Sequence, residues 1–430
     1  MTLDVEQDGC GPPARQVIIG IDWADAEHAF HLLDNNLAGS FEQTPVDIAR
    51  QVSDWRQRFP GATFCIAIEQ SRGPLITALV ECVDVLIYPI NPAALASYRK
   101  AFAHGGGKND PADAKLLANF LGHYRERLKP LVRDLPLTRE LASLGEDRRG
   151  LVDQRVALAN ELRAILKLYL PCILLLDADK LYAHFIVRLL LKYRTLDELQ
   201  NAGKTKLRKF FFGIGVAAKA EQRIELLMAA KPLTTDEVTI RSGARRVQAI
   251  VAQLDALNKS IDIYDAAIKL LVKEHANYPI VASLPGAATK TQCRLLAALG
   301  DDKSRYQNAA ALQAATGIAP ITSQSGKQKI VACRWASTKF LKQTFHEYAG
   351  LSIRKCRWAK AYYDMQLAHG KSAQMAKRAL AFKWQRIIFR CWQSNTLYND
   401  EKYLKRLQAE KAPLLQFITQ SATEASSNSK

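Results

Sequence analysis

Residues 16–22, QVIIGID, decide the fold, because a short apolar run rich in β-branched residues is typical of a buried strand. The pattern continues with strands at 28–34 (HAFHLLD), 63–69 (TFCIAIE) and 84–90 (DVLIYPI), and a helix at 71–83 (SRGPLITALVECV). Buried strands that alternate with helices predict an α/β domain over residues 15–125, with a central sheet covered by helices.

Acidic residues stand at the ends of two of these strands and at the start of a further helix. Asp22 ends the first strand, Glu69 ends TFCIAIE, and Asp110 and Asp113 lie three apart in GGGKNDPADAKLLANFL. The ends of adjacent parallel strands meet at one edge of a sheet, and an i, i+3 pair shares one helical face. Clustered carboxylates repel each other unless a cation neutralises them, and hard oxygen ligands suit Mg²⁺ or Mn²⁺. Two such ions, about 3.5–4 Å apart, can clamp the attacking and leaving oxygens of a phosphodiester.

Taken singly, each acid also fits an ordinary structural role. These roles are a turn residue for Asp22, a helix cap for Glu69, an N-cap for Asp110 and a first-turn dipole partner for Asp113. Asp25 and Glu27 are further candidate ligands, ranked lower because the terminal residue of a strand is better held. The combination of all four acids in one α/β frame favours the metal site.

The charge of the chain is unevenly distributed. The 430 residues carry a net charge of +18, but residues 1–125 hold 10 Lys and Arg against 15 Asp and Glu, so the other 305 residues carry +23. A basic remainder joined to an acidic N-terminal region predicts a polyanionic partner, although a soluble protein that is merely basic is the alternative. Eight scattered cysteines, no signal peptide and no sufficiently long apolar run predict a cytoplasmic protein that does not enter a membrane.

The middle zone, residues 126–275, is predicted to be a helical connector. Apolar residues follow a heptad pattern over 137–165, where Arg148 and Arg155 intrude at core positions, and more cleanly over 247–271. The pattern predicts a coiled coil that dimerises, while two helices packed inside one bundle remain the alternative. Residues 203–219, GKTKLRKFFFGIGVAAK, fit either a turn or a nucleic-acid contact.

The third zone, residues 276–405, is predicted to be mainly helical and nucleic-acid-binding, with 21 Lys and Arg against 6 Asp and Glu. Tails are predicted at residues 1–14 and 406–430. Aromatic residues of 352–392 could stack on bases, whereas Phe382 and Phe389 recur at helical spacing and fit a core better. The cations expected to face nucleic acid are Lys327, Arg354, Lys355, Arg357, Lys360, Lys377, Arg378 and Lys383.

The chain resembles the insertion-sequence transposases of the IS-one-ten type, the bridge-RNA-guided recombinases with a DEDD, RuvC-like domain. The N-terminal blocks that carry the resemblance are VIIGIDWADAEH, CIAIEQSRG, YPINPAALASYRKAF and GKNDPADAKLLANFL. The C-terminal blocks are SLPGAATKTQCRLLAALGD and NAAALQAATGIAPITSQSGK. The chain departs from the family where PGAA replaces a PGIG-like turn and Ser337-Thr338 replaces a Gly-Asn pair.

The resemblance implies an RNase H-like domain in which Asp22, Glu69, Asp110 and Asp113 hold magnesium. It implies a catalytic serine at Ser325, with Ser323 and Thr322 as neighbouring alternatives, whereas the residues alone fit a loop serine beside Gly326. No histidine lies near Ser325, so the family suggests activation by the metal site, in the same subunit or another.

The activity implied is cutting and rejoining of DNA through a transient phosphoserine bond, with an element-encoded RNA choosing the sites and a nucleoid-associated homo-oligomer as the assembly. Two alternatives remain open. One is a metal-dependent junction nuclease in which Ser325 is inert, and the other is a non-catalytic nucleic-acid scaffold.

Overall fold

The computed structural model describes residues 15–102, 110–326, 328–332, 334 and 337–418. These residues divide into two compact units, 1–133 and 134–430. The predicted N-terminal tail, residues 1–14, lies outside the described residues. Within the described ranges, no helix is both long and apolar enough to cross a membrane.

The N-terminal unit is built on a mixed sheet with the strand order β3-β2-β1-β4-β5. β1, β4 and β5 are parallel, whereas β1, β2 and β3 form antiparallel pairs. The strands are β1 (Gln16–Asp22), β2 (Glu27–Leu32), β3 (Leu37–Glu42), β4 (Thr63–Ile68) and β5 (Val85–Pro89). The four predicted strands are confirmed, and β3 is an additional edge strand.

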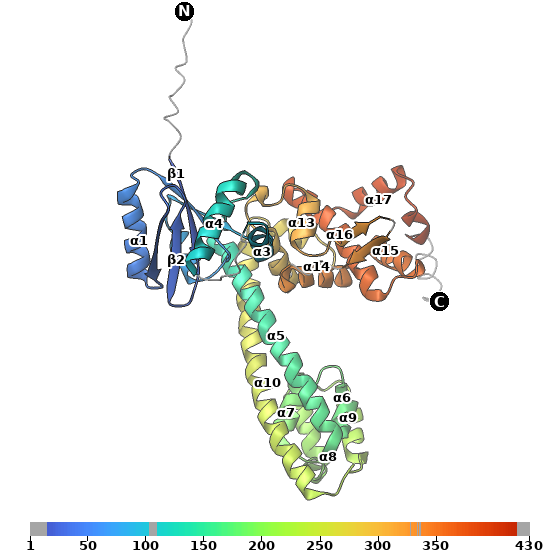
Figure 1. Ribbon diagram of the computed structural model, residues 1–430. Helices are drawn as coiled ribbons and strands as arrows, with labels where there is room; N and C mark the ends of the chain where they lie inside the picture. Colours follow the sequence, from blue (N-terminus) through green and yellow to red (C-terminus); the bar gives the residue numbers. More distant parts are fainter. Residues whose placement is uncertain (1–14, 103–109, 327, 333, 335–336, 419–430) are drawn as a thin grey trace, which may run out of the picture. The chain divides into compact units, whose positions relative to one another are not determined.

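Different helices cover the two faces of this sheet (Figure 1). On one face, alternate residues of β1, such as Ile19, pack with the buried Trp55. On the other face, Leu117 packs with Ala67. The helices are α1 (Pro45–Arg58) and α2 (Pro74–Leu79) on the first face, and α3 (Pro92–Phe102) and α4 (Asp110–Tyr124) on the second.

The second unit is organised by two long helices, α5 (Pro136–Tyr169) and α10 (Glu237–Leu271), which run antiparallel side by side (Figure 1). The two arginines that interrupt the heptad pattern both have partners. Arg148 Nε donates to Asp265 Oδ1 at 2.5 Å, and the Arg155 guanidinium lies 4.1 Å from the ring centre of Tyr182. The two heptad seams therefore pack against each other within one chain.

This pairing corrects the reason for expecting a dimer. The apolar seams were expected to pair with each other or with a partner subunit, and Leu162 of α5 and Leu254 of α10 are fully buried within the chain. The alternative of two helices packed inside one bundle describes the pair better. The buried seam residues therefore supply no argument for a dimer.

A separate hydrophobic core lies at each end of the helix pair. The first belongs to a small helical lobe inserted between α5 and α10 and is built with the end of α5 and the start of α10. The lobe helices are α6 (Leu174–Asp177), α7 (His184–Lys192), α8 (Leu196–Gly213) and α9 (Ala220–Ala229). Much of the segment 203–219 is therefore helical, with a kink at Gly203, where φ is +71°.

The second core joins the start of α5 and the end of α10 to the C-terminal helices. These elements are α11 (Tyr278–Ala282), α12 (Thr289–Leu299), α13 (Ala309–Ala315), α14 (Lys339–Ser352), α15 (Arg357–Ala368), α16 (Ala373–Gln393) and α17 (Asp400–Ala409). The predicted tail 406–430 is wrong in its first part, because Leu407 and Leu414 are buried in this core. Residues 419–430 lie outside the described residues.

Candidate functional site

The carboxyl ends of β1 and β4 bring two of the predicted acids to one edge of the sheet. The parallel register pairs Gly20 with Ala67, so its continuation by two residues places Asp22 beside Glu69. Asp22 is the last residue of β1 and is half-buried, whereas Glu69 follows β4 directly and is exposed.

Helix α4 brings the other two acids to the same end. Its backbone lies directly on β1, since a Cβ at Gly20 would be 2.0 Å from the Ala114 carbonyl oxygen. A Cβ at Gly122, two turns further along α4, would be 3.9 Å from Ile18. The helix thus runs opposite to β1, and its first turn, which holds Asp110 and Asp113, lies toward the end of β1 that carries Asp22.

We refer to Asp22, Glu69, Asp110 and Asp113 together as the acidic sheet end. Asp110 is exposed, but Asp113 is buried, and Arg99 Nη2 of α3 donates to its Oδ1 at 2.6 Å. Among the described residues, no group of three or more His, Cys, Asp or Glu side chains stands close enough to hold a metal ion. The fold therefore gathers the acids at one end without closing them into a ligand shell. Their hard oxygen donors are nevertheless of the type that Mg²⁺ and Mn²⁺ take.

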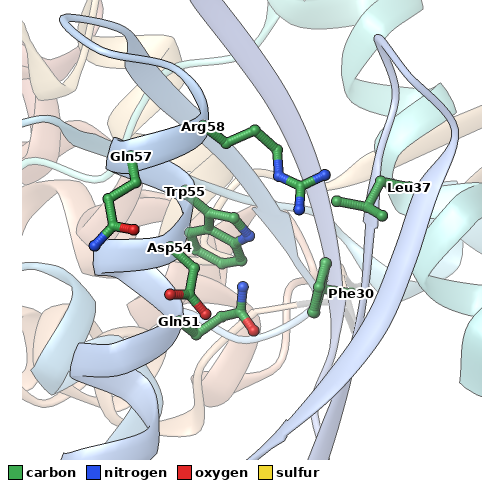
Figure 2. Close-up of a pocket in the computed structure, with 7 residues that line it drawn as sticks. All are labelled: Phe30, Leu37, Gln51, Asp54, Trp55, Gln57 and Arg58. Carbon is green, nitrogen blue, oxygen red and sulfur yellow. The ribbon is translucent and has the colours of Figure 1, made fainter.

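A hollow of about 500 Å³ on the same unit is separate from the acidic sheet end. It lies between α1 and the β2–β3 hairpin, where Gln51, Asp54 and Arg58 surround Trp55 (Figure 2). Trp55 packs on the face of the sheet that α1 covers, whereas α4 covers the opposite face. None of the predicted acids lines this hollow.

Ser325 lies at the tip of a small hairpin of β6 (Ile321–Ser325) and β7 (Gln328–Ala332), which we call the serine hairpin. Ser325 pairs with Gln328, and Gly326 has a φ of +56°, the left-handed conformation that a tight turn uses and glycine tolerates. The loop predicted here is thus partly a strand pair. All of β6 is exposed, including Ser323 and Thr322, and Lys327 lies outside the described residues.

The predicted phosphate-binding cations divide into two groups. Arg354, Lys355, Arg357 and Lys360 are exposed, whereas Lys377, Arg378 and Lys383 are half-buried. The expectation that Lys383 is exposed is wrong, because its ammonium lies 4.7 Å from the ring centre of Tyr362, and burial lowers its pKa. This lysine covers aromatic surface of the core.

The predicted stacking surface is also corrected in part. Trp358, Trp384 and Trp392 are fully buried, and the Trp384 indole donates to Ser352 Oγ at 2.8 Å. Phe382 and Phe389 are partly buried against the same core, as their helical spacing indicates. These tryptophans therefore hold the C-terminal core together and are not available to bases.

Two models of known protein families match the chain, one over the region of the acidic sheet end and one over the region of the serine hairpin. A family model described as "Transposase" matches residues 19–171, and one described as "Transposase IS116/IS110/IS902 family" matches residues 278–364. The chain belongs to the IS116/IS110/IS902 family of transposases. Members of this family are enzymes that act on DNA.

Individual relatives resemble the chain along most of its length. The mini-circle protein of IS117 from Streptomyces coelicolor, named as a candidate transposase, is 26% identical over 93% of this chain and 98% of its own. The uncharacterized 42 kDa protein of insertion element IS900 from Mycobacterium paratuberculosis is 26% identical over 90% of this chain and 98% of its own. The uncharacterized 44.8 kDa protein of insertion element IS116 from Streptomyces clavuligerus is 30% identical over 52% of this chain and 55% of its own.

The two family matches include some of the predicted site residues of this transposase and leave out others. The first match spans all of the acidic sheet end, and the second spans Ser325 and the exposed cations from Arg354 to Lys360. Lys377, Arg378 and Lys383 lie beyond it.

Reasoning from sequence missed Arg99, the ion-pair partner of Asp113. The signal was present in the block YPINPAALASYRKAF, where Arg99 is the first cation of a helix that precedes the Asp-x-x-Asp turn. Nothing in the sequence, however, indicates which acid that arginine would contact.

Proposed function

We propose that this transposase cuts and rejoins DNA strands with a divalent-metal site at the acidic sheet end and with Ser325 as the nucleophile. The observation that carries the proposal is the convergence of β1, β4 and α4, which brings Asp22, Glu69, Asp110 and Asp113 to one end of the N-terminal unit. The strand order β3-β2-β1-β4-β5 supports an RNase H-like fold for this unit.

Oxygen ligands at this end would hold Mg²⁺ or Mn²⁺, which neutralises charge on the attacked and leaving oxygens when bound. Asp22 and Glu69 extend from adjacent strand ends, and the exposed Asp110 extends from the first turn of α4. Asp113 would contribute once its contact with Arg99 is exchanged for the ion.

Ser325 suits attack on a phosphodiester because it is exposed at the tip of a hairpin, beside a glycine that leaves the backbone accessible. In the proposed step, a bond forms between Ser325 Oγ and phosphorus while the bond from phosphorus to one sugar oxygen breaks. The leaving oxygen takes up a proton, and the serine hydroxyl gives one up. Attack by another DNA end reverses these changes, so the strand is rejoined without net hydrolysis.

The decisive experiment is denaturing electrophoresis of the protein with labelled element DNA in the presence of Mg²⁺. A covalent adduct is expected for the unaltered protein and for Ser323→Ala, and no adduct for Ser325→Ala. Metal-dependent cutting with no adduct would favour the junction nuclease, and binding with neither would favour the scaffold. An adduct that persists in Ser325→Ala would assign the nucleophile elsewhere.

We further propose that a structured, element-encoded RNA and at least a homodimer take part. The exposed cations Arg354, Lys355, Arg357 and Lys360 support contact with nucleic-acid phosphates. Ile263 and Leu270 of α10 are exposed although apolar, which supports association outside the paired seams. RNA that copurifies with the protein, and sedimentation with and without that RNA, test both points. An RNA-free monomer at micromolar concentration would contradict them.

A further inference from the structure

A groove in the helical lobe gathers positive charge around an aromatic floor. It has a volume of about 760 Å³, within the size range of ligand sites. Both halves of α8 line it, with Asn201 before the kink at Gly203 and Lys206 and Lys209 after it. Lys192, the last residue of α7, is the third lysine that lines the groove.

The three lysines of the groove are not neutralised within the lobe. Lys192, Lys206 and Lys209 are exposed, and none of them forms an ion pair with another described residue. Arg208 of the same helix behaves differently, because it binds Glu221 through two hydrogen bonds of 2.5 and 2.7 Å. One carboxylate, Glu198, also lines the groove, so the lining carries a net charge of +2.

The floor of the groove is formed by two rings. Phe210 is partly exposed and meets Tyr193 edge-on, with ring centres 6.2 Å apart. The Lys192 ammonium lies 5.4 Å from the ring centre of Tyr193 and 5.7 Å from that of Phe210. These contacts hold the positive charge of Lys192 against the aromatic floor.

We propose that this groove binds a single-stranded nucleic-acid segment, with its phosphates on Lys206 and Lys209 and a base stacked on Phe210. Alternating cationic and aromatic groups in a concave surface suit single strands, because unpaired bases expose the flat faces that rings stack on. A duplex keeps its bases stacked internally and offers phosphates alone. Neither the acidic sheet end nor Ser325 takes part in this site.

The first test measures binding of short fluorescent oligothymidine and oligouridine by the full chain in EDTA, so that cleavage plays no role. Lys206→Gln/Lys209→Gln should weaken binding about tenfold. It should also reduce the slope of log affinity against log salt concentration by about 1.4, because each lost phosphate contact removes about 0.7 from that slope. Lys204→Gln/Lys269→Gln removes the same charge outside the groove lining and should change affinity less than twofold. Equal losses in the two double variants would overturn the site.

The aromatic half of the proposal is tested separately. Phe210→Leu should weaken binding of single strands about fivefold or more, Phe210→Tyr should restore it, and duplex binding should not change. A polyglutamate peptide that competes as well as an oligonucleotide of equal charge would show that only charge is read, which overturns the stacking.

Photocrosslinking then locates the bound strand within the full chain. Oligonucleotides with 4-thiouridine or 5-iododeoxyuridine should crosslink to peptides that contain Tyr193 or Phe210, and Phe210→Leu should reduce that crosslink. Crosslinks confined to the serine hairpin and the C-terminal helices would overturn the proposal. Comparing the two oligonucleotides shows whether RNA or DNA is preferred. Because no adduct or cutting is measured, failure here leaves the proposed chemistry untouched, and the reverse also holds.

Discussion

The acidic sheet end and the serine hairpin are built in opposite ways. The acids stand on strand ends and on a helix pressed against β1 at Gly20, so the backbone that carries them is fixed by close packing. Ser325 stands on a strand pair whose first strand is exposed along its whole length. One half of the proposed chemistry therefore stands on closely packed backbone, whereas the other half stands on an exposed strand pair.

The largest effects on recombination are expected for Ser325→Ala and Asp113→Asn, one substitution in each region. Both are expected to lower recombination by about a thousandfold or more, since each removes a group proposed to act on the phosphate. Their stabilities should differ. Ser325→Ala should leave the free energy of unfolding within about 0.5 kcal/mol, whereas Asp113→Asn should lower it by about 1–2 kcal/mol because Arg99 loses its charged partner. Chemical denaturation and a recombination assay give both values. Equal stability losses would contradict the contrast.

The packing of α4 on β1 is tested by Gly20→Ala. The added Cβ would lie 2.0 Å from the Ala114 oxygen and 2.4 Å from the Ala118 nitrogen, so the helix must move. We expect the N-terminal unit to lose about 3 kcal/mol of unfolding free energy and recombination to fall with it.

Gly150→Ala is the matched control for this change. Gly150 lies inside α5, and a Cβ there would have no atom within 4 Å apart from its chain neighbours and the backbone of its own helix. The substitution should stabilise the second unit by about 0.5–1 kcal/mol. A tolerated Gly20→Ala would show that the acids are not fixed by this contact.

Removing Arg99 sharpens the role of Asp113. In Arg99→Gln the cation 2.6 Å from Asp113 Oδ1 is lost, so a divalent ion no longer competes with it. Mg²⁺ affinity, measured by calorimetry on the full chain, should rise severalfold, while the unfolding free energy falls by about 1 kcal/mol. Unchanged Mg²⁺ affinity in this variant would argue that Asp113 is not a ligand.

The smallest expected effect concerns pH and a histidine of the second unit, His275, that belongs to neither region. Burial lowers the pKa of His275 below its ordinary value of 6.5, although Asp301 and Asp134 act in the opposite direction. The neutral imidazole is therefore favoured in the fold, where its Nε2 lies 2.8 Å from Thr138 Oγ1.

The stabilising contribution of His275 is fully present above pH 6.5 and is lost as the pH falls through the lowered pKa. Unfolding of the second unit should become easier in this range, and His275→Gln should flatten the pH dependence between pH 7 and 5. A slope that persists unchanged would assign the effect to other groups.

The strands that sequence could predict are those with continuous apolar runs, such as QVIIGID, which β1 reproduces residue for residue. β3, with the sequence LAGSFE, carries no such run. It becomes a strand because it pairs with β2 along its whole length at the edge of the sheet. The serine hairpin was missed for the same reason, since β6 buries none of its residues and leaves no pattern.

Sequence also predicted some features of the candidate site and missed others. Spacing and strand ends predicted four carboxylates around one centre. Backbone geometry brings β1, β4 and the first turn of α4 to one end, but among the described residues the acid side chains do not form a group close enough to hold a metal ion. The contact of Arg99 with Asp113 depends on how α3 packs, which no local pattern specifies. Heptads likewise predicted two seams and left open whether they pair within the chain or with a partner subunit, and α5 packs against α10 within the chain.

The antiparallel helix pair also acts as a ruler. At about 1.5 Å per residue, the 34 residues of α5 span roughly 50 Å, so the lobe groove and the C-terminal core are held at a fixed spacing. The contacts Arg148–Asp265 and Arg155–Asn258 set the register of α5 against α10. Adding one heptad to both helices would move the lobe outward by about 10 Å with its face preserved, whereas adding three residues would also rotate it. The length of α5 would then set the distance between the two proposed nucleic-acid contacts, the lobe groove and the cations of the C-terminal helices.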